Sequence, residues 1–538
     1  MFRFYDDELH NLVLVANKSV KEIISYLSIY DYHPPFQYIV NKFFLQIFGL
    51  NEFWLKLPSM LLILGSILIC SVLVKRFTGS FKAGLISGVI SIVNPLVLLW
   101  GTSIRWYPLW TFLTMLSIYF TLSLFTHRVR KIRTQILLAI TLTLALYTNY
   151  QTILLVITLL LSAFILDLKS KDKKFIHLKS TLPVIIGVII LFLPYINTFV
   201  NHLSTYIQQK HINSGTSNIS PLISGGYFIF SVLFGNSIYP WDIIFIIFSG
   251  IIVLTLFSIL AFPRFRKSVK QSFRISKFLP SEKMKEYFTL FLISGILSFL
   301  LFLFSILSNS LQARGYLIVP LLLITISSTL FYYSGKVKSG RSFNPLIIIA
   351  CSFIFLWLAG SFNVITRKSL HKASLMDPVG EVINSVQSRG DSAKTTYLIF
   401  TYDPVLTYYL LKECNDKNVI IYSPYKKELM NLTVTFNRNE LLSMKDYTSN
   451  KEILYIDSYP GSLEPIINKL NNIKQYLLSK SIESKKPIRL GFDPDAGIKR
   501  KLFPSAGVID WRYTIFRLAP ERNLDYNIIA SFNSLKVN

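Results

Sequence analysis

The stretch LPSMLLILGSILICSVLVKR, residues 57–76, decides the fold of this chain. Residues 57–74 contain no charged side chain, and a helix of about 20 such residues crosses the roughly 30 Å core of a bilayer. Lys75 and Arg76 follow the apolar run at once. An apolar run of this length that ends in basic residues predicts a membrane-spanning helix.

The rest of the chain has the same character. Of its 538 residues, 52% are hydrophobic and 16% are charged, whereas a soluble domain has about 25% charged residues. This composition excludes an ordinary soluble enzyme and a disordered protein. The run 221–236 is short and rich in Gly and Pro, which predicts an interfacial or re-entrant segment. Ten runs approach or reach the length of a span: 57–74, 83–100, 107–125, 135–149, 152–166, 181–200, 242–262, 287–307, 315–333 and 345–362.

Lys and Arg are distributed unequally between the loops that join these runs. One set of alternate loops carries 23 of them, over 75–82, 126–134, 167–180, 263–286 and 334–344. The other set carries 3, over 101–106, 150–151, 201–241 and 308–314. Basic loops stay in the cytoplasm, so the N-terminal segment and the tail are predicted to be extracytoplasmic. This topology accounts for the net charge of +27, and we expect no nucleic-acid partner.

The tail from about residue 366 has a different pattern. Strand-like runs such as TTYLIFTY and NVIIYS alternate with helix-like runs such as DPVGEVINSVQSRG, which predicts a small domain with a partly parallel sheet. The sequence therefore predicts a polytopic α-helical protein of the inner or plasma membrane with a C-terminal extracytoplasmic α/β domain. Its three parts are a first extracytoplasmic loop over 1–56, a transmembrane module over 57–362 and the α/β domain over 363–538.

The predicted outer face collects residues suited to group transfer. Acids cluster in the first outer segment, and single cations, Arg105 and Arg314, stand at the ends of separate spans. A carboxylate can take the proton of an attacking hydroxyl, and fixed cations can hold a leaving phosphate. The sequence contains no GxSxG and no HExxH, so a hydrolase has little support. Three cysteines are too few and too scattered for a disulfide framework or a zinc site.

The first outer segment carries a specific order of motifs. It contains Asp7-Glu8, Asp31-Tyr32-His33-Pro34-Pro35, Phe48-Gly49, Glu52 and Leu57-Pro58-Ser59. SIRWYPLWTF at 103–112 and QARGYLIVP at 312–320 follow. This order resembles bacterial members of the protein O-mannosyltransferase and lipid A aminoarabinose transferase group, which are GT-C glycosyltransferases. The resemblance covers most of the membrane part and, more loosely, the tail.

The resemblance implies a reaction and partners. A sugar would pass, with inversion, from a polyprenyl-monophosphate donor to a hydroxyl of a lipid, protein or glycan acceptor, in contact with membrane lipids. Asp7 would be the general base, with Glu8 and Asp31 as further catalytic candidates and Asp6 as a rival of Asp7. The donor phosphate or substrate would be bound by His33, Arg105, Tyr107 and Arg314. No metal ligand is assigned and no cofactor is demanded, although a divalent metal is left open.

Each candidate has a structural alternative. Asp7 and Glu8 also favour a helix N-terminus, and Asp31 could cap the helix that Pro34 starts. His33 could be a passive turn residue. The arginines could be interfacial anchors and Tyr107 part of an aromatic belt.

The sequence departs from the family pattern at two places, and two other functions are compatible with it. The family has a span before the acidic pair, whereas six residues precede Asp7, so we expect a natural start further upstream or a lost helix. Lys56 stands where the family often has arginine. The alternatives are a transporter or flippase of lipid-linked sugars and a non-catalytic envelope assembly protein. A transporter usually shows internal repeats, and the hydropathy of the two halves does not repeat.

The loop charges generate a prediction about topology. In a background without the three native cysteines, a cysteine near residue 450 should react with a membrane-impermeant maleimide added to intact cells. A cysteine near residue 270 should react only after the membrane is permeabilised, because it lies in the most basic loop. The opposite labelling pattern would overturn the assignment of the extracytoplasmic face.

Overall fold

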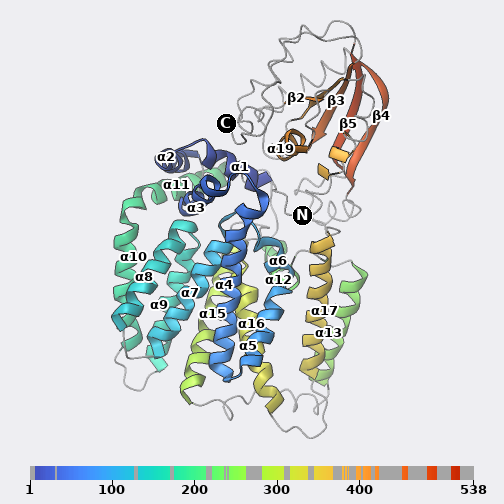
Figure 1. The fold of residues 1–538 in the computed structure, drawn as a ribbon. Helices are drawn as coiled ribbons and strands as arrows, with labels where there is room; N and C mark the ends of the chain where they lie inside the picture. Colours follow the sequence, from blue (N-terminus) through green and yellow to red (C-terminus); the bar gives the residue numbers. More distant parts are fainter. Residues whose placement is uncertain are drawn as a thin grey trace. The chain divides into compact units, whose positions relative to one another are not determined.

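The chain is described by a computed structural model in which most of the assigned elements are helices (Figure 1). Two compact units are distinguished, Met1–Lys21 with Asn41–Leu55 and Leu370–Asn538, and Glu22–Val40 with Lys56–Ser369. The described residues are 6–30, 33–126, 131–169, 175–213, 221–235, 238, 242–261, 281–307, 316–336, 345–366, 379–380, 382–384, 386, 396–401, 404–413, 419–422, 451–458, 481–492 and 511–520.

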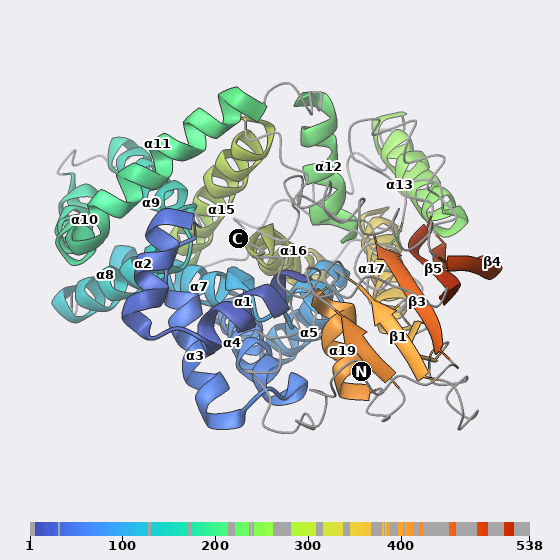
Figure 2. The same ribbon diagram turned by 90° about the horizontal axis from the view of Figure 1, so that it is seen from above.

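The larger unit is a helical bundle. Figure 2 shows α8, α9 and α10 grouped on one side and α13 with α17 on the other, with α7, α15 and α16 between them. The helices that build it are α2 (Val20–Tyr30), α4 (Glu52–Thr78), α5 (Phe81–Ile92), α6 (Pro95–Trp100), α7 (Trp106–Thr126), α8 (Lys131–Thr148), α9 (Thr152–Lys169), α10 (Ile176–Phe192), the 3-10 turn η1 (Leu193–Tyr195), α11 (Ile196–Asn213), α12 (Pro221–Phe234), α13 (Ile243–Ala261), α15 (Ser281–Leu307), α16 (Ile318–Lys336) and α17 (Pro345–Thr366).

Within the described residues, 7 helices are long and apolar enough to cross a membrane. They coincide with seven of the ten predicted runs, and the chain has the helices of an integral membrane protein. The other three runs, 83–100, 135–149 and 315–333, fall on shorter apolar helices.

The run 83–100 is not one helix, which corrects the prediction of a continuous span. It divides into α5 and α6 at Asn94 and Pro95. Proline has no N–H for the helix ladder and disfavours helical backbone at the residue before it. The Asn94 side chain restarts the helix, because its Oδ1 accepts from the backbone N–H groups of Leu96 and Val97, both at 3.1 Å.

The run 221–236 forms helix α12, which ends at a glycine. Gly235 has a φ of +77°, a conformation that glycine adopts without strain. A Cβ on Gly235 would lie 2.4 Å from Cγ of Pro95, so the end of α12 lies directly against the start of α6. Phe228 of α12 packs edge-on against Phe302 of α15 with ring centroids 5.6 Å apart. The helix is thus part of the bundle, and its interfacial or re-entrant character stays a prediction.

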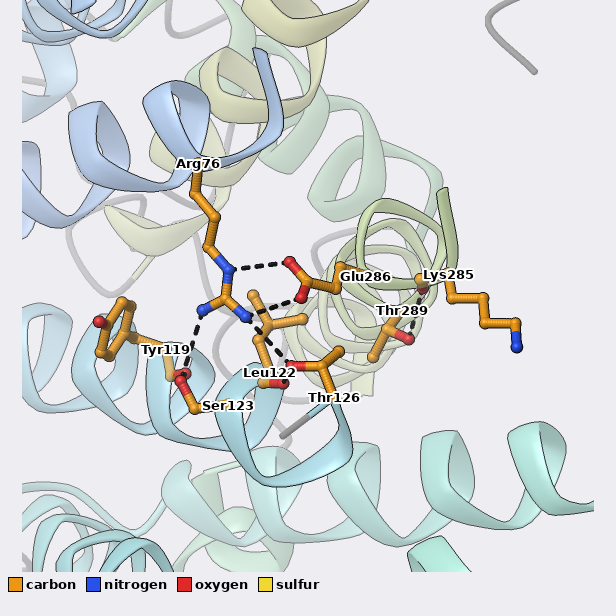
Figure 3. A network of polar contacts seen from close by, with 8 residues as sticks. All are labelled: Arg76, Tyr119, Leu122, Ser123, Thr126, Lys285, Glu286 and Thr289. Carbon is orange, nitrogen blue, oxygen red and sulfur yellow. Dashed lines mark hydrogen bonds and ion pairs between the residues drawn. The ribbon is translucent and has the colours of Figure 1, made fainter. Parts of the chain in front are cut away.

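At the end of the bundle where α4 and α7 finish and α15 begins, a charged pair joins three helices (Figure 3). Nε and Nη2 of Arg76 donate to the two carboxylate oxygens of Glu286 at 2.8 and 2.9 Å. Nη2 also donates to Thr126 at 3.1 Å. The side chains of Arg76 and Glu286 are only 19% and 10% exposed. Such a two-pronged pair fixes direction as well as distance, so it sets the register of α4 against α15.

A second carboxylate at the same end of the helices caps α10. Asp167, near the end of α9, accepts from the backbone N–H of His177 at 3.0 Å and of Leu178 at 2.8 Å. These are first-turn donors that α10 itself cannot satisfy. Oδ1 of Asp167 is also 2.7 Å from Nδ1 of His177. Asp167 therefore joins the end of α9 to the start of α10.

The described part of the tail contains a five-stranded sheet. Its strands are β1 (Thr396–Phe400), β2 (Val419–Tyr422), β3 (Lys451–Ser458), β4 (Ser481–Phe492) and β5 (Trp511–Pro520), in the order β2-β1-β3-β5-β4. β1 is parallel to β2 and β3, whereas β5 is antiparallel to β3 and β4. Helix α19 (Pro404–Glu413) connects the parallel strands β1 and β2. β4 is an edge strand, which accommodates Pro487.

The pair between α4 and α15 generates a prediction about stability. Glu286→Gln should lower the free energy of unfolding by about 1.5–3 kcal/mol, because the Arg76 guanidinium loses a charge-assisted partner while it stays largely buried. The measurement is thermal unfolding of the purified protein in detergent. Lys285→Gln is the matched control, because the Lys285 side chain points away from the pair (Figure 3). An unchanged melting temperature for Glu286→Gln would mean that the pair does not stabilise the bundle.

Candidate functional site

The predicted site residues fall into two groups. Asp31 and Arg314 lie outside the described residues, and Asp7 lies on helix α1 (Asp6–Ala16), with its side chain outside them. The described candidates are Glu8, His33, Arg105 and Tyr107. Glu8 is fully buried and His33 is half-buried.

Arg105 stands in a tight connection between α6 and α7. Gly101 ends α6 where a Cβ would lie 2.3 Å from the Val97 carbonyl oxygen and 2.9 Å from Ile63, so only glycine fits. The hydroxyl of Ser103 accepts from the backbone N–H of Arg105 at 3.3 Å. Arg105 is 9% exposed and its Nε is buried. An interfacial anchor extends its charged end into water, so the burial argues against that alternative.

The segment that holds His33 is attached to the Arg105 connection. Pro34 and Pro35 are buried, and helix α3 (Phe36–Phe48) begins directly after them. In its first turn, Nε2 of Gln37 donates to the Ile104 carbonyl oxygen at 3.0 Å, and this bond is buried. Ile104 is the residue before Arg105. Two candidates that are 72 positions apart in the sequence, His33 and Arg105, are therefore brought onto neighbouring segments.

Tyr107 is enclosed by other aromatic rings. It is 2% exposed, and its ring lies 4.5 Å from Trp106 and 5.6 Å from Trp100, measured between centroids. Trp110, one turn further along α7, donates its indole N–H to the hydroxyl of Thr152 at 2.9 Å. A ring so enclosed does not face the lipid–water interface, so the aromatic-belt alternative is wrong for Tyr107. A contact to substrate stays a prediction.

Lys56 is a buried cation that stands where the resembled family often has arginine. It lies in the first turns of α4 and is 4% exposed. A lysine is almost never fully buried unless it has a partner. The signal is present in the sequence, because Lys56 stands directly before the apolar run 57–74 in a segment predicted to be extracytoplasmic, which opposes the charge bias of the loops.

His202 is a second residue that sequence reasoning missed. It lies on α11 and is 4% exposed. Its Nε2 is 2.9 Å from the Leu27 carbonyl oxygen on α2, and its Nδ1 is 2.8 Å from the Tyr150 hydroxyl. No local motif marks it, since its partners are 175 and 52 positions away.

In the smaller unit, the acidic helix α1 is fixed by polar contacts of its own. The Asn41 amide donates to Oδ1 of Asn11 at 3.1 Å, and Nζ of Lys42 donates to the Val15 carbonyl oxygen at 3.0 Å. Both contacts are made by residues of α3 after the first turn. These two hydrogen bonds therefore fix the position of helix α1, which carries Asp7 and Glu8, against α3.

Helix α19 belongs to the same unit and packs against α1. Lys412 of α19 forms an ion pair with Glu52, the first residue of α4. Burial raises the pKa of Tyr408 above its ordinary value, and the nearby carboxylates of Glu52 and Glu413 raise it further. Tyr408 is therefore a neutral hydroxyl at physiological pH.

Two of these residues carry a positive charge that is chemically suited to an anion such as phosphate. Arg105 and Lys56 are cations held at low exposure, and electrostatic interactions are stronger where water is excluded. A planar guanidinium matches the oxygens of a phosphate in two-pronged geometry. Among the residues whose placement is known, no group of three or more His, Cys, Asp or Glu side chains could hold a metal ion.

Comparison with known proteins gives one family match. Residues 32–197 match the profile of the dolichyl-phosphate-mannose-protein mannosyltransferase family. No curated protein matches the sequence. Among solved structures, the chain is similar to ArnT from Cupriavidus metallidurans bound to undecaprenyl phosphate, with 13% identity, a TM-score of 0.45 and coverage of 96% of this chain and 94% of that one.

A second solved structure is more distant. The archaeal oligosaccharyltransferase AglB from Archaeoglobus fulgidus, in complex with an inhibitory peptide and a dolichol-phosphate, has 9% identity and a TM-score of 0.35, with coverage of 89% of this chain and 68% of that one. The profile match contains His33, Arg105 and Tyr107, whereas Asp7, Glu8, Asp31 and Arg314 lie outside it. Over residues 32–197 the chain thus has the sequence pattern of the dolichyl-phosphate-mannose-protein mannosyltransferase family, which confirms the resemblance that its motifs indicate.

Proposed function

We propose that this protein is an integral-membrane glycosyltransferase that moves a sugar from a polyprenyl-monophosphate donor to an acceptor hydroxyl on the extracytoplasmic side. The observation that carries the proposal is the joining of two family-matched segments by the Gln37–Ile104 hydrogen bond. It brings the His33 segment next to the buried Arg105. The family profile supports the donor class, because the family name includes a lipid phosphate that carries mannose.

In this proposal Arg105 holds the donor phosphate, and His33 and Lys56, which belong to the same unit, are further candidates for that contact. Cations at low exposure stabilise the charge that develops on the leaving phosphate oxygen. They stabilise it more than they would in water, because little solvent remains to screen the field. Arg314 is proposed as a further phosphate ligand on the strength of its RGYLIVP context alone.

The chemical step is a single displacement at the anomeric carbon. The acceptor hydroxyl gives its proton to the Asp7 carboxylate while its oxygen forms the new bond to the anomeric carbon. The bond between that carbon and the phosphate oxygen breaks, and its electron pair leaves on the polyprenyl monophosphate. Attack opposite to the leaving group inverts the anomeric centre.

Asp7 is preferred as base over Glu8 for a reason of burial. Glu8 is fully buried, and a base must come within hydrogen-bond reach of a hydroxyl that arrives from outside. Asp7 precedes Glu8 on helix α1. Glu8 is proposed to orient the helix instead, and Asp31 remains the alternative base.

The base assignment predicts the effect of an isosteric substitution. Asp7→Asn should lower turnover roughly 10²–10⁴-fold, the usual contribution of general acid–base catalysis, while insertion and donor binding are retained. Transfer of labelled sugar from a polyprenyl-phosphate donor in purified membranes measures it. Asp6→Asn is the neighbouring control and should be milder. Full activity of Asp7→Asn together with loss in Asp31→Asn would move the base to Asp31, and activity in all three variants would favour transport or binding over transfer.

The phosphate assignment predicts a difference between two cations. Arg105→Lys should raise the KM for the donor roughly tenfold, because an ammonium cannot reproduce the two-pronged contact of a guanidinium to phosphate. Arg133→Lys, an exposed arginine in the first turns of α8, is the matched control and should change nothing. The assignment fails if both variants bind and turn over the donor alike.

A further inference from the structure

We propose that His202 is a positioning residue for the donor site, because it fixes the end of helix α2 that leads into the His33–Pro35 segment. This inference rests on the proposed function, since it assigns His202 a part in the same site. His202 itself is on α11, and it contacts Leu27 and Tyr150.

The geometry determines the state of the imidazole ring. Nε2 lies 2.9 Å from the Leu27 carbonyl oxygen. A carbonyl oxygen only accepts, so Nε2 carries the proton and donates. In the neutral ring, Nδ1 is then an acceptor, and the Tyr150 hydroxyl at 2.8 Å donates to it. The ring is therefore oriented from both sides, by the α8–α9 hairpin on one and by α2 on the other.

The Leu27 carbonyl group, to which His202 donates, lies in the last turn of α2. α2 ends at Tyr30, and the last four carbonyl groups of a helix have no partner within it. Leu27 is among these four, and it is fully buried. A buried carbonyl without a hydrogen bond is costly, so the His202 donor stabilises this ending of α2 over others.

The other side of the His33–Pro35 segment is held independently. Gln37, two residues after Pro35, donates to the Ile104 carbonyl oxygen. His33 thus lies between two anchors, Leu27 and Gln37, both of which are bonded to distant parts of the same unit. Two prolines stiffen the segment between them. Loss of one anchor leaves the other in place, so the segment shifts while the fold is retained.

Substitution of His202 by glutamine or asparagine distinguishes a role as hydrogen-bond donor from a role in packing alone. In His202→Gln the amide nitrogen can occupy the place of Nε2 and donate to Leu27. In His202→Asn the side chain is shorter and reaches only the place of Nδ1. We expect His202→Gln to stay close to wild type, whereas His202→Asn should raise the KM for the donor roughly 3–10-fold with little change in kcat, as the net worth of one hydrogen bond implies.

Tyr150→Phe provides a test that keeps the histidine. It removes the hydroxyl that orients the ring, so a smaller rise in KM is expected. Tyr147→Phe on α8 is the matched control, because it likewise deletes a tyrosine hydroxyl. The Tyr147 hydroxyl donates to the Leu191 carbonyl oxygen at 3.2 Å in an exposed hydrogen bond, and it does not contact His202 through that bond. Tyr147→Phe should behave as wild type.

A second readout does not depend on catalysis. Amide hydrogen exchange in peptides that span residues 24–40 should be faster in His202→Asn than in wild type or His202→Gln, and binding of undecaprenyl phosphate should be weaker. Equal exchange and equal binding in the Asn and Gln variants would overturn the proposal. Faster exchange and weaker binding in His202→Asn, in a protein whose wild type transfers no sugar, would support the positioning role and reject the proposed transferase.

Discussion

The structure depends on one constraint, which is that the hydrocarbon core of a bilayer offers no hydrogen-bond partner to the backbone. The break between α5 and α6 shows how the chain meets it. Pro95 cannot donate, and Asn94 caps the new helix with its side chain. The Val93 carbonyl oxygen, freed by the break, accepts from the Ser361 hydroxyl of α17 at 2.8 Å. A helix can therefore be interrupted in the bundle because α17 supplies the missing partner.

The same constraint separates two uses of buried charge. Arg76 meets Glu286 in a two-pronged pair, so positive and negative charge cancel and three helices are joined. Arg105 and Lys56 are also held at low exposure, but on segments that match or border the family profile. A buried charge that only stabilises a fold gains little over an apolar side chain of similar size. Under the proposed function, Arg105 and Lys56 would in addition bind the donor phosphate.

Each of the two units carries its own set of charged groups. The larger unit carries the cations and the His33 segment, and the smaller unit carries the acidic helix α1 together with α19 and the sheet. Transfer needs both a held phosphate and a carboxylate that takes a proton. The ion pair of Glu52 with Lys412 links the start of the first long span to the tail within the smaller unit. The tail is thus joined to the segment that carries the proposed base.

The sequence by itself determined the spans and the motifs, because apolar length and local residue order are properties of single segments. Seven of the ten runs became helices of spanning length, and the Tyr32–Pro35 and Arg105 patterns lie inside the family match. The sequence did not predict strand β4, because SIESKKPIRLGF is charged and contains proline. An edge strand permits both features. Tertiary structure alone decided which segments meet: Gln37 with Ile104, and His202 with Leu27. These contacts join residues far apart in the chain, and a hydrogen bond between distant segments has no periodicity that a sequence could display.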